Sequence, residues 1–177
     1  MLEEVHRFWF EEIDSDQWRR YEPSFDALLK KRFLSVLQQA SAGELFAWRN
    51  QPRGRLAEII ILDQFSRNIY RGTPQAFAQD PMVLALAQEA VSAGVMNELN
   101  ERERSFLLMP YMHSESQVIH VQAQALFKQY APARYQAELK HKVIIDRFGR
   151  YPHRNEILGR VSTSEEVEFL KLPGSGF

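Results

Sequence analysis

The sequence contains no cysteine among its 177 residues, and this absence excludes several classes of protein. Without thiols the chain cannot form a disulfide scaffold, a thiolate zinc site, an iron–sulfur cluster or a cysteine nucleophile. No apolar run approaches the roughly 20 residues that a membrane-spanning helix needs. The N-terminus also lacks the basic segment and apolar stretch that are typical of a signal peptide. These absences predict a cytoplasmic protein that does not associate with membranes.

An excess of charge of either sign is missing as well. The 22 basic and 23 acidic residues leave a formal net charge of −1. This balance argues against broad electrostatic binding to nucleic acid. A chain of this length is typical of one compact domain that buries roughly 70% of its unfolded surface. We therefore expect a single domain over residues 1–172 and a loose tail over residues 173–177.

Strand signals are absent, and nearly every segment has the apolar periodicity of an α-helix. The clearest case begins at Ser24, keeps an apolar stripe for more than four turns, and stops at Gly43. Capping patterns predict four more helix starts, at Asp80, Asn100, Ser114 and Thr163. Helices of this length joined by short turns predict an all-α fold of antiparallel helix pairs, stacked as a bundle or a short superhelix.

Charged residues interrupt an otherwise apolar helix around Asp63. At 100° per residue, Asp63, Arg67 and Arg71 share one stripe, and apolar residues cover the opposite side. Asp63 and Arg67 are four residues apart and can form an internal ion pair that fixes the helix packing. Alternatively, Arg67 and Arg71, with Asn68 beside them, face a cavity and bind a carboxylate or phosphate. Both interpretations remain open at this point.

A proline-interrupted junction at residues 109–115 places His113 between two predicted helices. With Glu115, His113 could form an acid–base pair or supply two metal ligands. The spacing lacks the i, i+4 arrangement of a helical zinc site, so we expect no metal. The alternative is a histidine that is bonded to the backbone of the junction.

The segment from residue 147 to residue 160 is basic, with four arginines against the single acid Glu156. Pro152 predicts the start of a short helix here. The candidate residues around this start are Arg150, His153, Arg154 and Asn155. Arginine near a helix N-terminus opposes the helix dipole, so a bound anion would account for this arrangement. Otherwise the arginines are solvated or pair with acids elsewhere in the chain.

Three motifs carry a resemblance to a known family. They are LDQFSRNIYRGTP at 62–74, MPYMHSE at 109–115, and RFGRYPHRN at 147–155 with LGR at 158–160. In this order they resemble the bacterial domain-of-unknown-function family 924, from about Val5 to Leu170. Ser66 stands where that family usually has proline. The resemblance implies an all-helical, tetratricopeptide-like superhelix, and it implies no established activity and no assigned catalytic residues.

Two functions fit these residues, and the sequence does not decide whether the protein is an enzyme. The first is a site for an anionic small molecule, bound by Arg67, Asn68, Arg71, Arg150, Arg154 and Asn155. The catalytic candidates in such a site are His113, His153, Asp63 and Glu115. The second function is a tetratricopeptide-like scaffold that binds proteins or peptides.

The polar character of the motifs favours the first function and predicts a shared cavity. We expect it to be surrounded by Asp63, Arg67, His113, Arg150 and His153. No cofactor is implied. RNA binding has less support, because arginines near aromatic rings could stack on bases but no RNA-binding motif is present. Exposed aromatic residues could also form a homodimer interface.

Overall fold

The computed structural model describes residues 1–18 and 21–176, and every regular element in that part of the chain is helical. The α-helices are α1 (Leu2–Arg7), α2 (Pro23–Ser41), α3 (Pro52–Ile60), α4 (Ser66–Ile69), α5 (Asp80–Ser92), α6 (Glu101–Leu107), α7 (Met109–His113), α8 (Gln117–Tyr130), α9 (Tyr135–Phe148) and α10 (Ser164–Leu170). Short 3₁₀ turns are η2 (Phe46–Asn50), η4 (Pro74–Phe77), η5 (Val95–Asn97), η6 (Pro132–Arg134) and η7 (Pro152–Arg154). Two π-helical turns are η1 (Phe8–Glu12) and η3 (Ile61–Phe65). The prediction of an all-α fold is confirmed.

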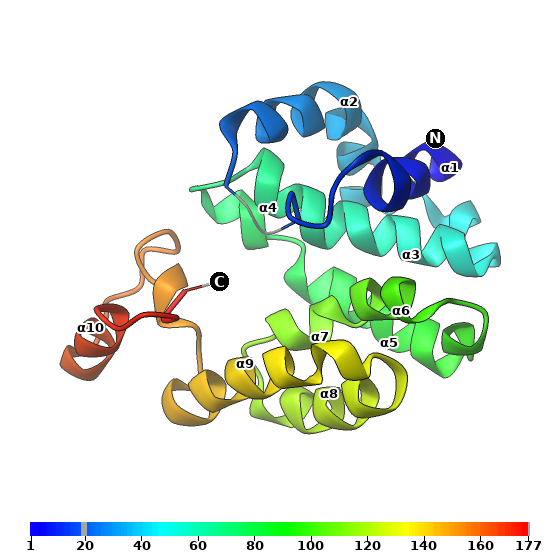
Figure 1. The fold of residues 1–177 in the computed structure, drawn as a ribbon. Coiled ribbons are helices and arrows are strands. Elements are labelled where there is room, and N and C mark those ends of the chain that lie inside the picture. The colour runs from blue at the N-terminus through cyan, green and yellow to red at the C-terminus, as the bar shows by residue number, and fades with distance from the viewer. Residues whose placement is uncertain (19–20, 177) are drawn as a thin grey trace.

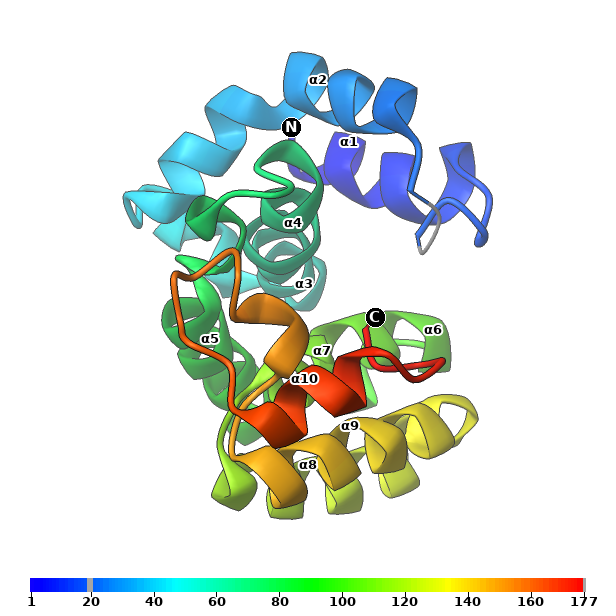
Figure 2. The same ribbon diagram turned by 90° about the vertical axis from the view of Figure 1, so that its left-hand side faces the viewer.

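The helices form two stacked groups with a C-terminal segment at their side (Figure 1). Helices α1 to α4 make one group, and α5 to α9 make the other, in which α8 and α9 pack against each other as an antiparallel pair. The C-terminal segment, residues 149–176, includes η7 and α10 and lies over the side of α5 and α7 (Figure 2). Residues from the end of the chain therefore reach helices from its middle. No described helix has both the length and the apolar character needed to cross a bilayer.

Aromatic rings form the centre of the first group. Trp9 and Phe33 lie with their ring centroids 5.5 and 4.9 Å from that of Phe65. All three side chains are fully buried, and such ring pairs stabilise a core beyond the area they bury. Because Trp9 belongs to η1 and Phe65 to η3, the core holds both π-helical turns in place.

A smaller apolar cluster attaches the C-terminal segment. Ile144 and Ile145 of α9 pack with Tyr151, and Phe148 and Phe169 cover them. Tyr151 is 1% exposed, and its hydroxyl donates a 2.5 Å hydrogen bond to the carbonyl oxygen of Met112. The segment is therefore fixed by both apolar burial and a buried hydrogen bond.

Two of the four predicted helix starts have the expected caps. Asn100 and Thr163 each form a complete capping box with the glutamate three residues later. The box predicted at Ser114 is wrong, because α8 begins after Ser116, whose N–H donates to the Ser114 hydroxyl. Asp80 begins α5 but is not its capping residue, because its carboxylate binds two arginines instead.

Candidate functional site

Asp63 lies in a π-helical turn within a longer helix. Elements α3, η3 and α4 follow one another without a break from Pro52 to Ile69. Such π turns are rare and are frequent at functional sites. The neighbouring side chains of η3 are buried, and Asp63 itself is 1% exposed. A carboxylate in this environment needs charged or hydrogen-bonding partners.

His113, at the end of α7, is one of those partners. Its Nδ1 lies 2.7 Å from Oδ1 of Asp63, and Nη1 of Arg67 lies 3.0 Å from the same oxygen. The side-chain amide of Gln64 donates to the other oxygen, Oδ2. Burial raises the pKa of Asp63, but the charge of Arg67 and the hydrogen bonds from His113 and Gln64 outweigh it and hold the pKa well below its usual range. Asp63 is therefore ionised.

His113 itself is kept neutral. Burial lowers the pKa of His113, and the positive charges of Arg67 and Arg154 act in the same direction. The carboxylate of Asp63 raises this pKa but does not outweigh them. The His113 side chain is 16% exposed, so it is partly accessible from solvent.

Asp80 joins Arg67 to Arg154 from the first turn of α5. Nη2 of Arg67 lies 3.0 Å from Oδ2 of Asp80, and Nη1 of Arg154 lies 3.1 Å from the same oxygen. Nη2 of Arg154 also donates to the backbone oxygen of His113 at 3.0 Å. Asp63, Arg67, Asp80, His113 and Arg154 thus form one connected group, which we call the central cluster. It contains two arginines, two aspartates and a neutral histidine, so its charges balance.

The guanidinium group of Arg154 is held by aromatic rings as well. It lies 4.7 Å from the ring centroids of both Phe77 and Tyr151, within the range of cation–π contacts. Arg154 is 5% exposed, and burial lowers its pKa. Its buried Nε–H has no acceptor among the described residues. The Arg154 guanidinium group is therefore held in one orientation, and its Nε–H is available to donate a hydrogen bond.

Glu115 connects α7 to the C-terminal segment rather than pairing with His113. Its carboxylate accepts a 2.7 Å hydrogen bond from the Tyr151 N–H and two from Arg160, at 2.6 and 2.9 Å. Burial raises the pKa of Glu115, but Arg160 and the Tyr151 N–H outweigh it and lower the pKa. This arrangement holds the C-terminal segment against the end of α7.

Arg150 and Asn155 contact partners within the C-terminal segment. Arg150 makes two hydrogen bonds to Glu166, at 2.6 and 2.7 Å, and Asn155 donates to Ser162 and Glu166. The hydrogen bonds from Arg150 lower the pKa of Glu166 to about 2. These two candidates stabilise the local fold, and the structure does not bring Arg150 into the central cluster.

A short helix begins at Pro152 as predicted, but it is a single 3₁₀ turn over residues 152–154. A turn of this length lacks the helix dipole that the expected anion site requires. The arginines of this basic segment pair instead with acids from other parts of the chain, namely Glu165, Glu166, Asp80 and Glu115.

Arg71 and Asn68 lie at the end of the same helix as Asp63 but outside the central cluster. Because α4 ends at Ile69, Arg71 leaves the predicted stripe and makes two hydrogen bonds to Asp26 of α2, at 2.6 and 3.0 Å. Asn68 donates to the backbone of Gln64 and accepts from Arg71. Arg71 thus links the end of this helix to α2, and Asn68 holds the Arg71 side chain.

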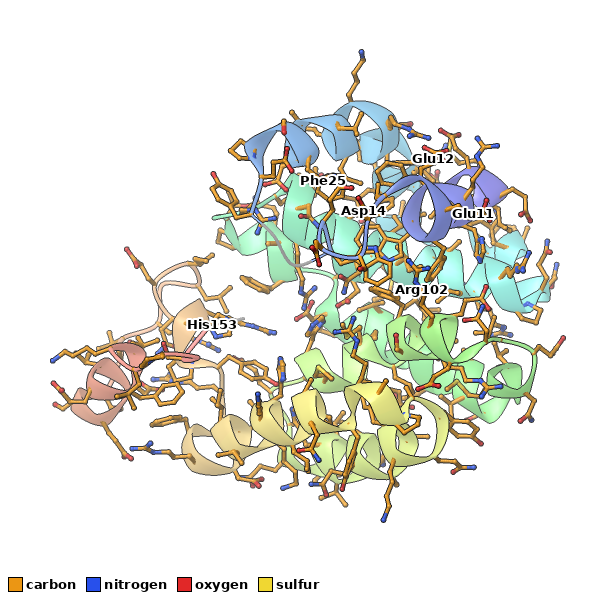
Figure 3. The ribbon with its side chains drawn as sticks, viewed as in Figure 1. Glu11, Glu12, Asp14, Phe25, Arg102 and His153 are labelled. Atoms are coloured by element: carbon orange, nitrogen blue, oxygen red, sulfur yellow. The ribbon has the colours of Figure 1, made fainter. Side chains whose placement is uncertain are left out.

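His153 precedes Arg154 in η7, on the side of the C-terminal segment that faces the other helices (Figure 3). Its ring centroid lies 5.6 Å from that of Tyr151. Burial lowers the pKa of His153 to about 4, and the charge of Arg154 adds to this effect. The backbone at Gly176 passes beside its Cβ.

Asp80 and Phe77 also belong to this region, although neither is among the site residues predicted from the sequence. Asp80 carried a signal, since it precedes Pro81, but that signal indicated a helix cap. Two surface cavities lie elsewhere: one of about 370 Å³ is lined by α2, η4 and the turns beside them, and one of about 430 Å³ is lined by α5, α7 and α8, so neither is the predicted shared cavity. Within the described residues, no group of three or more histidine, aspartate or glutamate side chains is placed to hold a metal ion.

Comparisons with known proteins agree with the three sequence motifs. The family model described as "Bacterial protein of unknown function (DUF924)" matches residues 5–174. The solved structure of a protein of unknown function, ATU0120 from Agrobacterium tumefaciens, is 32% identical in sequence, with a TM-score of 0.91 over 96% of each chain. No protein with a curated description matches. The chain therefore belongs to the DUF924 family of bacterial proteins of unknown function.

Proposed function

We propose that this protein binds a small anionic molecule, through a carboxylate or phosphate group, between Arg67 and Arg154. The observation that supports the proposal is the position of Asp80. Its carboxylate accepts hydrogen bonds from both guanidinium groups, at 3.0 and 3.1 Å. A position where two arginines converge on one carboxylate has the geometry that a carboxylate or phosphate ligand needs.

The ligand would compete with Asp80 for this position. The charges of the central cluster balance, so an additional anion gains little unless one carboxylate moves away. The Asp80 side chain is 20% exposed and lies in the first turn of α5, where the helix dipole stabilises a carboxylate that turns toward solvent. Asp63 is 1% exposed and has no comparable route to solvent. Asp80 is therefore the residue that the ligand replaces.

The two arginines are held in place for such an exchange. Arg67 donates to the backbone oxygen of Asp63 at 2.9 Å, and Arg154 donates to that of His113. Neither contact involves Asp80, so both guanidinium groups keep their orientation when Asp80 leaves. Preorganised donors bind more tightly because less side-chain freedom is lost on binding. The unpaired Nε–H of Arg154 is a further donor for the ligand.

Thermal unfolding in the presence of phosphate, succinate and nucleotides tests the proposal. An anion that binds the folded state raises the melting temperature, and the shift grows with the logarithm of the anion concentration once that concentration exceeds Kd. The Asp80→Asn variant removes the competing charge, so it should bind the same anion at least tenfold more tightly than the wild type. The Arg154→Ala variant should lose the response. Arg71→Ala, which removes an arginine paired with Asp26 on the surface, should keep the wild-type response.

If no anion raises the melting temperature of either the wild type or Asp80→Asn, the proposal is contradicted. It would favour the second candidate function, a protein- or peptide-binding scaffold. That candidate is supported by the outer face of α8, where Val118 and Val121 are 69% and 62% exposed, one turn apart. Self-association is its simplest form. It would be detected by sedimentation as a dimer that Val121→Glu converts to a monomer.

A further inference from the structure

We infer that His113, positioned by Asp63, acts as a general base on a water molecule beside the bound anion, so that the site hydrolyses a small ester that carries an anionic group. The inference rests on the proposed function, because Arg67 and Arg154 must hold the anionic group of the substrate. It adds a reaction and a catalytic residue to what would otherwise be a binding site.

The contact between Asp63 and His113 determines which ring nitrogen is available. An ionised carboxylate can only accept a hydrogen bond, so Nδ1 of His113 must carry the proton in the 2.7 Å contact with Asp63. In a neutral imidazole the other nitrogen, Nε2, then has a free lone pair. Nε2 makes no hydrogen bond to any of the described residues, and it is not one of their fully buried unpaired atoms. It is therefore able to accept a proton.

Asp63 is held so that it can orient the ring. Arg67 and Gln64 both contact its carboxylate, and the buried surroundings of η3 leave it no alternative rotamer in solvent. A carboxylate in this relation to histidine fixes the tautomer and stabilises the imidazolium that forms when the base takes up a proton. Asp63 is thus a positioning residue, and His113 is the catalytic one.

His113 is also close to the proposed anion position. Arg67 contacts the same oxygen of Asp63 that faces His113, and it contacts Asp80 through its other terminal nitrogen. Arg154 contacts Asp80 through Nη1 and the backbone oxygen of His113 through Nη2. Each arginine therefore bridges the anion position and the Asp63–His113 pair. When the anionic group of the substrate binds between the two arginines, the adjoining ester lies near the His113 side chain.

The reaction balances without a co-reactant other than water. Nε2 of His113 takes a proton from water as the water oxygen bonds to the carbonyl carbon of the ester. The tetrahedral intermediate then breaks its bond to the alcohol oxygen, and the imidazolium returns the proton to that oxygen. The products are a carboxylic acid and an alcohol, and His113 is again neutral.

Two chromogenic esters that differ in one carboxylate test the inference. Mono-4-nitrophenyl succinate carries the anionic group, and 4-nitrophenyl acetate lacks it. We expect the wild type to hydrolyse the succinate ester with the higher kcat/KM. His113→Gln should lower kcat on this ester by 10²- to 10⁴-fold, the usual contribution of a general base. Arg154→Ala should raise KM for the succinate ester more than it raises KM for the acetate ester.

The positioning role of Asp63 is tested by a measurement whose result would not change if Asp63 were purely structural. In the wild type, ¹⁵N NMR of the His113 ring should show a protonated Nδ1 and an unprotonated Nε2. In Asp63→Asn the Nδ1 tautomer should lose its preference, and the pH dependence of kcat/KM should shift. If Asp63→Asn fails to fold, the wild-type NMR spectrum and the His113→Gln kinetics still test the inference.

The outcomes separate the two proposals. If succinate raises the melting temperature but the succinate ester is not hydrolysed, or is hydrolysed equally by His113→Gln, the inference fails and the binding proposal remains. Equal kcat/KM for the two esters also overturns the inference, because the anion would have no role. If no tested anion stabilises the wild type or Asp80→Asn, and the succinate ester is not hydrolysed, both proposals fail.

Discussion

Asp63 and His113 are joined by a 2.7 Å contact between Oδ1 and Nδ1, although 50 positions separate them in the chain. The contact forms where a π-helical turn meets the last residue of α7. Arg67 contacts the same oxygen, and Arg154 contacts the His113 backbone. Changes to any one of these residues therefore affect the charge balance of all of them.

Neutralising Asp63 should destabilise the protein strongly. Asp63→Asn keeps the shape of the side chain but leaves Arg67, 18% exposed, with Asp80 as its only carboxylate partner among the described residues. Breaking a buried ion pair in this way costs about 3 kcal/mol. The change in free energy of unfolding can be measured in urea. Asp146→Asn, which alters a carboxylate that is 47% exposed and paired with Lys142, should change it by less than about 0.5 kcal/mol.

Replacing Arg154 by lysine should show that its planar group is needed. Lysine keeps the positive charge, but it cannot contact Asp80 and the His113 oxygen together while lying on two aromatic rings. We expect Arg154→Lys to lower the free energy of unfolding by about 1 to 3 kcal/mol. Arg147→Lys is the matched control, because Arg147 also pairs with a glutamate and lies over an aromatic ring but is 48% exposed. A loss of equal size in both variants would contradict this expectation.

Acid should destabilise the protein through His153. Its folded pKa of about 4 lies below the ordinary value near 6.5, so the unfolded chain takes up a proton first as the pH falls. Stability that is complete above pH 6.5 is then lost as the pH falls toward 4. His141, with a folded pKa of about 3, acts in the same direction.

The contribution of His153 can be isolated by mutation. Thermal unfolding of the wild type and of His153→Gln would be followed between pH 7.5 and 4.5. We expect the variant to lose about 1 to 2 kcal/mol less than the wild type over this range. Identical pH profiles would show that His153 is not the group responsible.

Glu115 should hold the C-terminal segment in place. The Glu115→Gln variant has no carboxylate to pair with Arg160, and the hydrogen bond that this side chain accepts from the Tyr151 N–H is weakened because the charge is lost. We expect faster hydrogen exchange in residues 150–162, measured by mass spectrometry, with no change in α1 and α2. Glu165→Gln removes an exposed partner of Arg147 and should leave exchange in residues 150–162 unchanged. Faster exchange throughout the chain would indicate general destabilisation instead.

Local spacing in the sequence was sufficient to predict the helices and some of the residues at which they begin. The capping boxes at Asn100 and Thr163 could be predicted because all their partners lie within three residues. The helix through Asp63 and Arg67, and their contact, follow from periodicity in the same way. The π-helical turn could not be predicted, because it depends on how Phe65 packs against Trp9 and Phe33.

The sequence by itself determined an all-α protein of the DUF924 family, without thiol chemistry and with polar motifs at three places in the chain. Only the tertiary structure decided which polar residues meet. It placed Arg154 against Asp80 and His113, and it placed Arg150 against Glu166 instead. The physical reason is that helical periodicity depends on neighbours within a few residues, whereas an ion pair depends on which distant helix packs alongside.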